Sequence, residues 1–278
     1  MLNLYSETKY MFKEIKSLQN YNIKYVLQIK EKSRTRKKDG VFFIEGKKEL
    51  NLAIKNGYKI KTIYFNNELC GSLINSYANS KVEIISVSKK VYKKIAYRGS
   101  TEGLVAIAET KSHLLNDVKI KNKNPFILVA ESIEKPGNIG ALIRTADAAN
   151  VDVLIIADPR TELYNPNVIR SSVGGIFTVQ IAIAKSIEVI DFMNKRNIPI
   201  YSAILKKSIS YDEVNYTQSC CIAVGTENNG LSDQWKNSAS KAIKIPMLGS
   251  LDSMNVSVAA GIILFEVCRQ RKINPTTS

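Results

Sequence analysis

The sequence predicts an α/β protein with a parallel sheet in its carboxyl-terminal half and a second, smaller α/β domain in front of it. From residue 125 onward, short apolar runs alternate with segments whose apolar residues recur at helical spacing. The runs are continuously apolar, which is typical of parallel strands covered by helices on both faces. Between residues 114 and 124 this rhythm is lost. We therefore expect one domain over residues 1–113, a linker over 114–124 and a second domain over 125–278.

The front domain has a βαβαβ-like order. It contains a basic segment, either helical or loop, with Lys30, Lys32, Arg34, Arg36, Lys37 and Lys38. A helix through Leu50 and Ala53 is expected to end at Gly57, because glycine readily terminates helices. A second helix is expected over residues 72–80, and strands over 41–46, 59–65, 81–87 and 103–109.

In the back domain, the sequence predicts six strands and five helices. Strands are expected over residues 125–130, 152–158, 177–184, 198–205, 220–225 and 242–247. Helices are expected over residues 138–151, 165–174, 186–197, 231–240 and 255–271. Ligands of parallel sheets bind beyond the carboxyl ends of the strands. We therefore expect the chemistry in the loops after the first, fifth and sixth of these strands.

The composition excludes several classes of protein. No stretch reaches the roughly 20 apolar residues that cross a bilayer, and the charged start does not resemble a signal peptide, so we expect no membrane partner and a cytoplasmic protein. Cys70, Cys220, Cys221 and Cys268 form neither a disulfide framework nor metal-ligand spacing, and we expect buried thiols. The single histidine, His113, stands just before the linker with no second histidine, so histidine-based metal sites and Ser-His-Asp hydrolysis lack their parts. We expect no metal.

The positive charge is concentrated in the front domain. The net charge is +15, and residues 1–120 hold 23 Lys and Arg against 11 Asp and Glu, whereas the remainder holds 17 against 14. Such asymmetry suits a polyanion, because each phosphate that a Lys or Arg neutralises releases condensed counterions. A solvated, lysine-rich surface is the alternative, and we favour nucleic acid over it.

The loop after the first strand of the back domain, KPGNIG, leads into a helix. Gly137 and Gly140 permit close approach of a partner to the backbone, and Asn138 is a good N-cap at a helix end that favours anions. An ordinary cap is the alternative for Asn138. Arg144 lies in the second turn, where it either pairs with Asp147 or binds an external anion. This loop is not the dinucleotide fingerprint, since only G-x-x-G is present.

The other two loops place polar groups at similar positions. In VGTENNGLSD, a turn and a cap by Ser232 explain every residue except Glu227. In IPMLGSLDSMN, a polar loop leads into a helix that is apolar almost all round and must be buried. Ser253 is a candidate cap, whereas Asn255, just inside a buried helix, needs a hydrogen-bonding partner.

Together these loops resemble the motifs of the SpoU/TrmH family of RNA 2'-O-ribose methyltransferases. PGNIGALIRTADAANVD, NPNVIRSSVGGIF, VGTENNGLSD and IPMLGSLDSMNVSVAAGIILFE match its motifs in order, over about residues 125–271. Met254 departs from the usual leucine, a mild change. More weakly, SRTRKKDGVFFIEGKKELNLAI and EGLVAIAE resemble the small ribosomal-protein-like RNA-binding domain that many members carry at the front.

The resemblance implies a deep trefoil knot in the back domain, with S-adenosylmethionine bound in it. The positions that match the family's cofactor-binding residues are Leu205, Gly225, Ile245 and Met254. The resemblance also implies a homodimer through the carboxyl-terminal domain, with Arg170 reaching the RNA from the partner subunit. In the front domain, Arg34, Arg36, Lys37 and Lys38 are the expected RNA contacts.

The implied reaction needs alignment of a sulfonium methyl with a ribose 2'-hydroxyl, and stabilisation of the oxyanion that forms. Arg144 is the candidate for activating that hydroxyl. Because arginine keeps its proton in proteins, we favour electrostatic stabilisation over a role as base, and phosphate-assisted proton transfer stays open. Asn138, Glu227, Ser253 and Asn255 would orient the ribose, the arginine and the cofactor.

The favoured substrate is large-subunit ribosomal RNA, because the two-domain layout with a basic front module resembles ribosomal RNA methylators. A transfer RNA methyltransferase and a non-catalytic RNA-binding or ribosome-assembly protein are the alternatives. A nucleotide-binding oxidoreductase is disfavoured by the incomplete glycine fingerprint.

Overall fold

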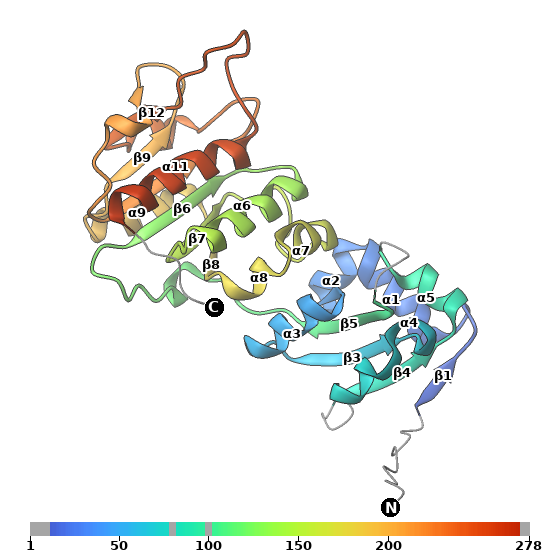
Figure 1. Ribbon diagram of the computed structural model, residues 1–278. Helices are drawn as coiled ribbons and strands as arrows, with labels where there is room; N and C mark the ends of the chain where they lie inside the picture. Colours follow the sequence, from blue (N-terminus) through green and yellow to red (C-terminus); the bar gives the residue numbers. More distant parts are fainter. Residues whose placement is uncertain (1–11, 78–81, 98–101, 273–278) are drawn as a thin grey trace, which may run out of the picture. The chain divides into compact units, whose positions relative to one another are not determined.

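The computed structural model describes residues 12–77, 82–97 and 102–272. The chain forms two compact units, Met1–Lys111 and Ser112–Ser278, each with its own sheet (Figure 1).

The front unit is built on a mixed five-stranded sheet. Its strands are β1 (Lys13–Ile15), β2 (Val41–Glu45), β3 (Ile60–Phe65), β4 (Glu83–Val87) and β5 (Leu104–Glu109), in the order β1-β4-β3-β5-β2. β5 is antiparallel to both of its neighbours, and the other pairs are parallel. The helices are α1 (Tyr21–Glu31), α2 (Ser33–Asp39), α3 (Lys47–Lys55), α4 (Asn67–Cys70) and α5 (Lys89–Ile95).

The predicted elements of the front unit are present, with one helix altered and three elements added. Where we expected a helix over 72–80, a 3₁₀ helix covers Gly71–Tyr77 after α4, and residues 78–80 lie outside the described ranges. Strand β1 and helices α4 and α5 were not predicted. The basic segment is helical, since it forms the end of α1 and all of α2.

The prediction that Arg36 contacts RNA is wrong. Its side chain is buried, with the residue only 4% exposed, and its Nη1 donates hydrogen bonds to the carbonyl oxygens of Ile29 at 2.6 Å and Lys30 at 3.1 Å. The last carbonyls of a helix lack partners within the helix, so Arg36 satisfies the end of α1. Arg34, Lys37 and Lys38 are exposed.

The back unit is built on a seven-stranded sheet in which all neighbours are parallel. Its strands are β6 (Phe126–Glu131), β7 (Val153–Ala157), β8 (Ile181–Ala184), β9 (Ile200–Ala203), β10 (Ile209–Ser210), β11 (Cys220–Val224) and β12 (Lys241–Lys244), in the order β10-β12-β9-β11-β6-β7-β8. The helices are α6 (Pro136–Ala148), α7 (Pro166–Ser172), α8 (Gly175–Thr178), α9 (Ser186–Lys195), α10 (Asp233–Asn237) and α11 (Val256–Arg271).

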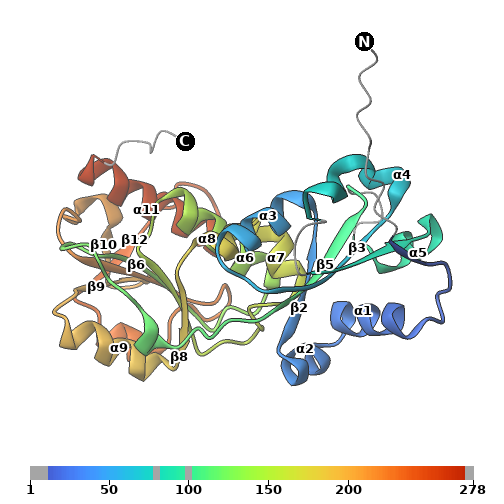
Figure 2. The same ribbon diagram turned by 90° about the horizontal axis from the view of Figure 1, so that it is seen from below.

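Helices cover both faces of this sheet, as the continuously apolar strands predicted (Figures 1 and 2). The side chains of α9 and α10 form one core with Ile127, Val129, Ile155 and Ala223, while α6 and α11 lie on the opposite face. The strand predicted over 177–184 begins at Ile181, because α8 takes its first residues. Within the described ranges, no helix is long and apolar enough to span a membrane, and no group of His, Cys, Asp and Glu suits a metal ion.

The segment that precedes β6 is attached to the edge of the back sheet. Nδ1 of His113 lies 3.0 Å from the carbonyl oxygen of Ile181, and Nε2 lies 2.7 Å from the hydroxyl of Tyr164. Leu114 forms a parallel bridge with Ile183. Cys70, Cys220 and Cys221 are buried free thiols, whereas Cys268 is half-buried.

Candidate active site

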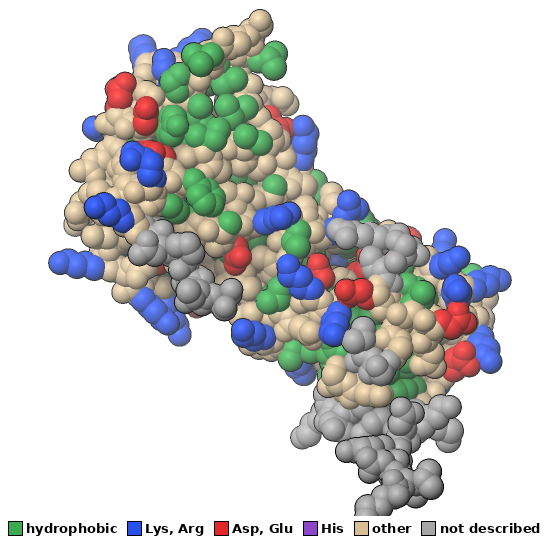
Figure 3. Space-filling view, viewed as in Figure 1, with side chains coloured by type: hydrophobic (Ala, Val, Ile, Leu, Met, Phe, Trp, Pro, Cys, Tyr) green, Lys and Arg blue, Asp and Glu red, His purple; other side chains and the backbone are tan. Residues whose placement is uncertain are grey.

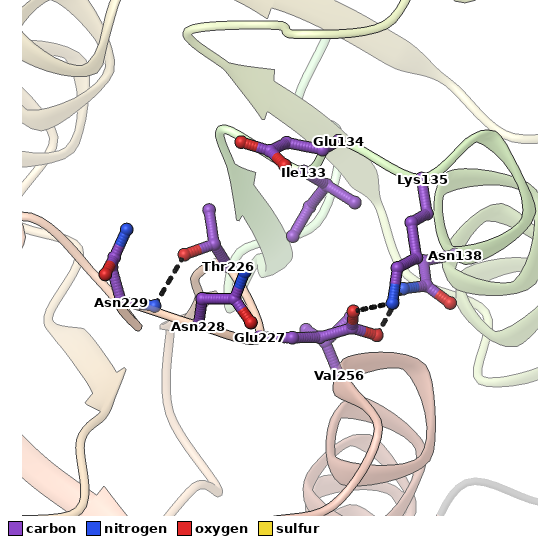
Figure 4. Close-up of a pocket in the computed structure, with 9 residues that line it drawn as sticks. All are labelled: Ile133, Glu134, Lys135, Asn138, Thr226, Glu227, Asn228, Asn229 and Val256. Carbon is purple, nitrogen blue, oxygen red and sulfur yellow. Dashed lines mark hydrogen bonds and ion pairs between the residues drawn. The ribbon is translucent and has the colours of Figure 1, made fainter.

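Two neighbouring cavities lie beyond the carboxyl ends of the central strands. The larger, of about 790 Å³, is lined by the loops that follow β9, β11 and β12 and by the start of α11. All four expected cofactor residues line it: Leu205, Gly225, Ile245 and Met254. The smaller cavity, of about 50 Å³, opens between the start of α6 and the loop after β11 (Figure 4). Residues 226–229 and Val256 line both cavities.

The larger cavity suits a nucleoside cofactor. Its volume falls in the range of small-molecule sites, and it combines apolar side chains with the backbone groups of three loops. An adenine ring needs such a flat apolar slot with hydrogen bonds at its edge. The residues present therefore fit the S-adenosylmethionine that the motifs imply.

Glu227 is the centre of a polar cluster that joins the three loops. Its Oε1 accepts hydrogen bonds from Nδ2 of Asn138 at 2.5 Å and from Nδ2 of Asn255 at 2.9 Å. Nδ2 of Asn255 also lies 3.1 Å from Oδ1 of Asn138. On the other side, Oε2 of Glu227 accepts from Nζ of Lys135 at 2.6 Å, and Figure 4 shows the side chains of Lys135 and Asn138 converging on Glu227. Residues 28 to 117 positions apart thus meet because parallel strands end at one edge.

The loop that carries Glu227 folds back on itself. Thr226 and Gly230 exchange backbone hydrogen bonds of 3.1 and 2.9 Å. Gly230 adopts a φ of +66°, a left-handed conformation that favours glycine. At Gly225, a Cβ would lie 2.3 Å from the carbonyl carbon of Gly230, so only glycine allows this close return.

The end of this loop is anchored by a buried carboxylate. Glu131, the last residue of β6, accepts hydrogen bonds from the backbone N–H of Ser232 at 2.8 Å and from Oγ of Ser186 at 3.3 Å. The indole of Trp235 donates to the same Ser186 hydroxyl at 2.9 Å. Because buried polar groups need partners, this network fixes where the loop leaves the site and α10 begins.

The helix caps differ from expectation at two positions. Asn138 is not the N-cap of α6: that position is Lys135, which makes no side-chain cap, and Asn138 lies in the first turn, where its amide reaches Glu227. At α11 the N-cap is Asn255, whose Oδ1 accepts from the N–H of Ser257, and not Ser253. Ser253 lines the larger cavity, with its Oγ 3.4 Å from Oδ1 of Asp252.

The expected arginines lie outside this cluster. Arg144 is exposed on α6, two turns after its start, and it makes no hydrogen bond or ion pair with the residues that the structure describes. Asp147, its alternative partner, instead accepts from the hydroxyl of Thr178. Arg170 is exposed in the last turn of α7.

Helix α11 is not buried all round. Val258 is 53% exposed and Phe265 is 52% exposed, and Figure 3 shows hydrophobic side chains at the surface on the side that carries this helix. The opposite side packs on α6 and the sheet through Ala260, Ile263, Leu264 and Val267. The prediction of a fully buried helix is therefore wrong for the single chain.

The electrostatics of the site centre on one ion pair. The Glu227 side chain is 24% exposed, and the ammonium of Lys135, followed by the amide of Asn138, holds the pKa of its carboxyl below the ordinary 4.5.

Two residues of the site were not predicted from the sequence, Lys135 and Glu131 with its network. The one signal for Glu131 was an acidic residue at the end of a wholly apolar strand.

A parallel sheet with a cofactor-sized cavity and a polar cluster at its carboxyl edge defines an α/β domain suited to bind a small-molecule cofactor. Residues 125–265 match the SpoU rRNA Methylase family, and residues 20–106 match the MRM3-like substrate binding domain. The chain belongs to the SpoU rRNA methylase family.

Relatives of known activity cover nearly the whole chain. The chain is 24% identical to the 23S rRNA (guanosine(2553)-2'-O)-methyltransferase RlmP of Bacillus subtilis, over 92% of this chain and 99% of that protein. It is 26% identical to a 23S rRNA (uridine(2479)-2'-O)-methyltransferase of Streptomyces viridochromogenes, over 85% of each.

Solved structures agree with this assignment. An RNA 2'-O ribose methyltransferase of 33% identity superposes with a TM-score of 0.82, covering 94% of this chain and 100% of that one. The SpoU methyltransferase AviRb from Streptomyces viridochromogenes, in complex with AdoMet, gives a TM-score of 0.84 at 25% identity, over 91% of this chain and 99% of that one. The expected fold is confirmed, a trefoil-knotted parallel-sheet methyltransferase domain behind a small α/β domain. The enzyme class and the cofactor, S-adenosylmethionine, are confirmed as well.

Proposed function

We propose that the chain transfers a methyl group from S-adenosylmethionine to a ribose 2'-hydroxyl of 23S ribosomal RNA. The observation that carries the proposal is the meeting of Asn138, Glu227 and Asn255 beside a cavity of cofactor size. The 23S specificity of the two relatives described above supports the substrate class.

In this proposal the larger cavity holds the cofactor. Leu205, Ile245 and Met254 would hold the adenine with apolar atoms, and the chain at Gly225 would offer it backbone groups. When bound, the cofactor supplies an electrophilic sulfonium methyl. No strong base is then needed, so the protein mainly aligns the 2'-oxygen and stabilises the charge that develops on it.

Arg144 activates the hydroxyl. Its guanidinium makes no hydrogen bond or ion pair with the described residues, so it is available to an RNA phosphate or to the developing alkoxide. Because the guanidinium keeps its proton, it acts through charge, and a phosphate-assisted proton transfer stays open. Ser253, which lines the cofactor cavity, and the Glu227 cluster orient the ribose.

Two further features belong to the proposal. The front unit captures the RNA through the exposed Arg34, Lys37 and Lys38, without the buried Arg36. The chain forms a homodimer through its carboxyl-terminal domain, which would cover Val258 and Phe265 and would let Arg170 contact RNA bound at the partner's site. We place this enzyme in the cytoplasm, where ribosomal RNA would be its substrate.

The test compares Arg144→Ala with Arg196→Ala, the loss of another exposed arginine, which lies just after α9 on the opposite face of the sheet and contacts Phe192. With 23S RNA and labelled S-adenosylmethionine, Arg144→Ala should lose about 100-fold or more in rate while binding cofactor as well as the wild type does. Arg196→Ala should remain active. Full activity of Arg144→Ala would reject its role.

The substrate is tested separately. Mapping of 2'-O-methyl sites in RNA from cells with and without the gene should show one site lost from 23S RNA. Loss from a transfer RNA instead would favour the transfer RNA alternative. A non-catalytic assembly protein would lose no site, and it would show no thermal shift with S-adenosylmethionine.

A further inference from the structure

Lys135 stands at the junction between the loop after β6 and helix α6. It occupies the N-cap position but makes no side-chain cap, and its side chain is 72% exposed. Its Nζ lies 2.6 Å from Oε2 of Glu227, a residue 92 positions later in the chain. The side chain thus reaches from the start of α6 to the loop after β11, and both residues line the small cavity (Figure 4).

The two oxygens of Glu227 have separate partners. Oε2 accepts from Lys135, while Oε1 accepts from the amides of Asn138 and Asn255. Among the described residues, Lys135 makes the one ion pair of this carboxylate. The short turn at residues 226–230 is closed by its own backbone hydrogen bonds, and these bonds do not hold the Glu227 side chain. Without Lys135 the carboxylate could therefore rotate, or move outward together with its loop.

We propose that Lys135 is a positioning residue of the methyl-transfer site. By holding Oε2 of Glu227, it leaves Oε1 in place to orient the amides of Asn138 and Asn255 toward the acceptor ribose. The inference rests on the proposed function, since it assigns Lys135 a task in that reaction.

The exposure of the Lys135 side chain allows a positioning role to be told apart from a contribution to stability. Ion pairs with exposed partners contribute little to folding, so removal of the charge should leave unfolding nearly unchanged. Misplacement of catalytic groups by about 1 Å, in contrast, can lower a rate by about 100-fold. A fall in rate without a fall in stability is therefore the expected signature.

The charged surroundings of Glu227 give a second signature. Besides Lys135, the charged residues that line the two cavities are Glu134, Lys206, Lys207, Lys236, Lys244 and Asp252. None of them forms an ion pair with Glu227. Removal of Lys135 should therefore raise the pKa of the Glu227 carboxyl, and the acidic limb of the pH–rate profile should move to higher pH.

The experiment compares Lys135→Met, Lys135→Arg and Lys195→Met in the full chain. Lys195 is a matched control, because it pairs with Asp191 at the same 2.6 Å distance and its side chain is 70% exposed, but it lies at the end of α9. For each variant, kcat, KM for RNA, the cofactor Kd, the pH–rate profile and the melting temperature are measured. A ¹³C NMR titration follows the Glu227 carboxyl, assigned with Glu227→Gln.

We expect kcat of Lys135→Met to fall about tenfold or more, with the cofactor Kd and the melting temperature unchanged, the acidic limb shifted and the Glu227 titration moved to higher pH. Lys135→Arg should recover most of the rate, and Lys195→Met should match the wild type. If Lys135→Met keeps the rate and pH profile of an active wild type, the role of Lys135 is refuted while the proposed function stands. A wild type that methylates no RNA would refute the proposed function itself.

Discussion

Replacement of Gly225 with alanine is expected to displace the loop that carries Glu227. The added Cβ would lie 2.3 Å from both the carbonyl carbon and the oxygen of Gly230, and 2.4 Å from the backbone nitrogen of Leu231. All of these neighbours are backbone atoms, so no side chain can turn away to relieve the contact. The loop itself must move.

The size of the movement follows from ordinary contact distances. Non-bonded carbon atoms approach to about 3.5 Å, so Gly230 must retreat by roughly 1 Å. A shift of roughly 1 Å would lengthen the hydrogen bonds of Glu227 beyond the roughly 3.2 Å limit for such bonds. Overpacking of this kind costs about 1–3 kcal/mol of unfolding free energy, and a misplacement of this size lowers the rate by about 100-fold.

Urea unfolding, calorimetric titration with S-adenosylmethionine and methyl transfer to 23S RNA measure the three consequences. Gly249→Ala is the control, because no heavy atom lies within 4 Å of its would-be Cβ and its φ is not left-handed. We expect Gly225→Ala to lose stability, cofactor affinity and rate, while Gly249→Ala loses none of them. If Gly225→Ala binds the cofactor and methylates RNA within about twofold of the wild type, the close return of the loop does not control the site.

Three further predictions concern the back unit. In α6, Gly137→Ala should stabilise the protein by up to about 1 kcal/mol through helix propensity, whereas Gly140→Ala should destabilise it by about 1–3 kcal/mol. Gly137 has open space, whereas a Cβ at Gly140 would lie 1.9 Å from Oγ of Ser171, and urea unfolding should show opposite signs. The pKa of Glu227 is lowered by Lys135 and by the amide of Asn138, so the small stabilisation of the ionised carboxylate relative to Glu227→Gln should be full above the ordinary 4.5 and should be lost as the pH falls through the lower folded-state pKa. The free energies of unfolding of the wild type and of Glu227→Gln are measured at several pH values, and a difference between them that stays constant would contradict this prediction. Phe265→Asp should yield monomers in sedimentation without loss of fold, since Phe265 is exposed in the single chain.

The amino-acid sequence by itself determined the layered architecture and the location of the chemistry. Continuous apolar runs can only be buried on both faces, so they predicted the parallel sheet, and parallel strands bring their carboxyl ends to one edge. The loops with Asn138, Glu227 and Asn255 were therefore recognisable before any distance was known. Their side chains do lie within hydrogen-bonding distance of one another.

Tertiary structure alone decided which neighbour each side chain meets. In the sequence Arg36 resembles its basic neighbours, but in the structure its guanidinium donates hydrogen bonds to the last carbonyl oxygens of α1. Lys135 looked like an ordinary surface lysine until the loop after β11 placed Glu227 beside it. Position 225 must be glycine because the backbone of Gly230 returns so close that a Cβ would not fit. Local patterns follow from residues close in sequence, whereas these contacts join segments that only the folded chain brings together, and periodicity carries no information about them.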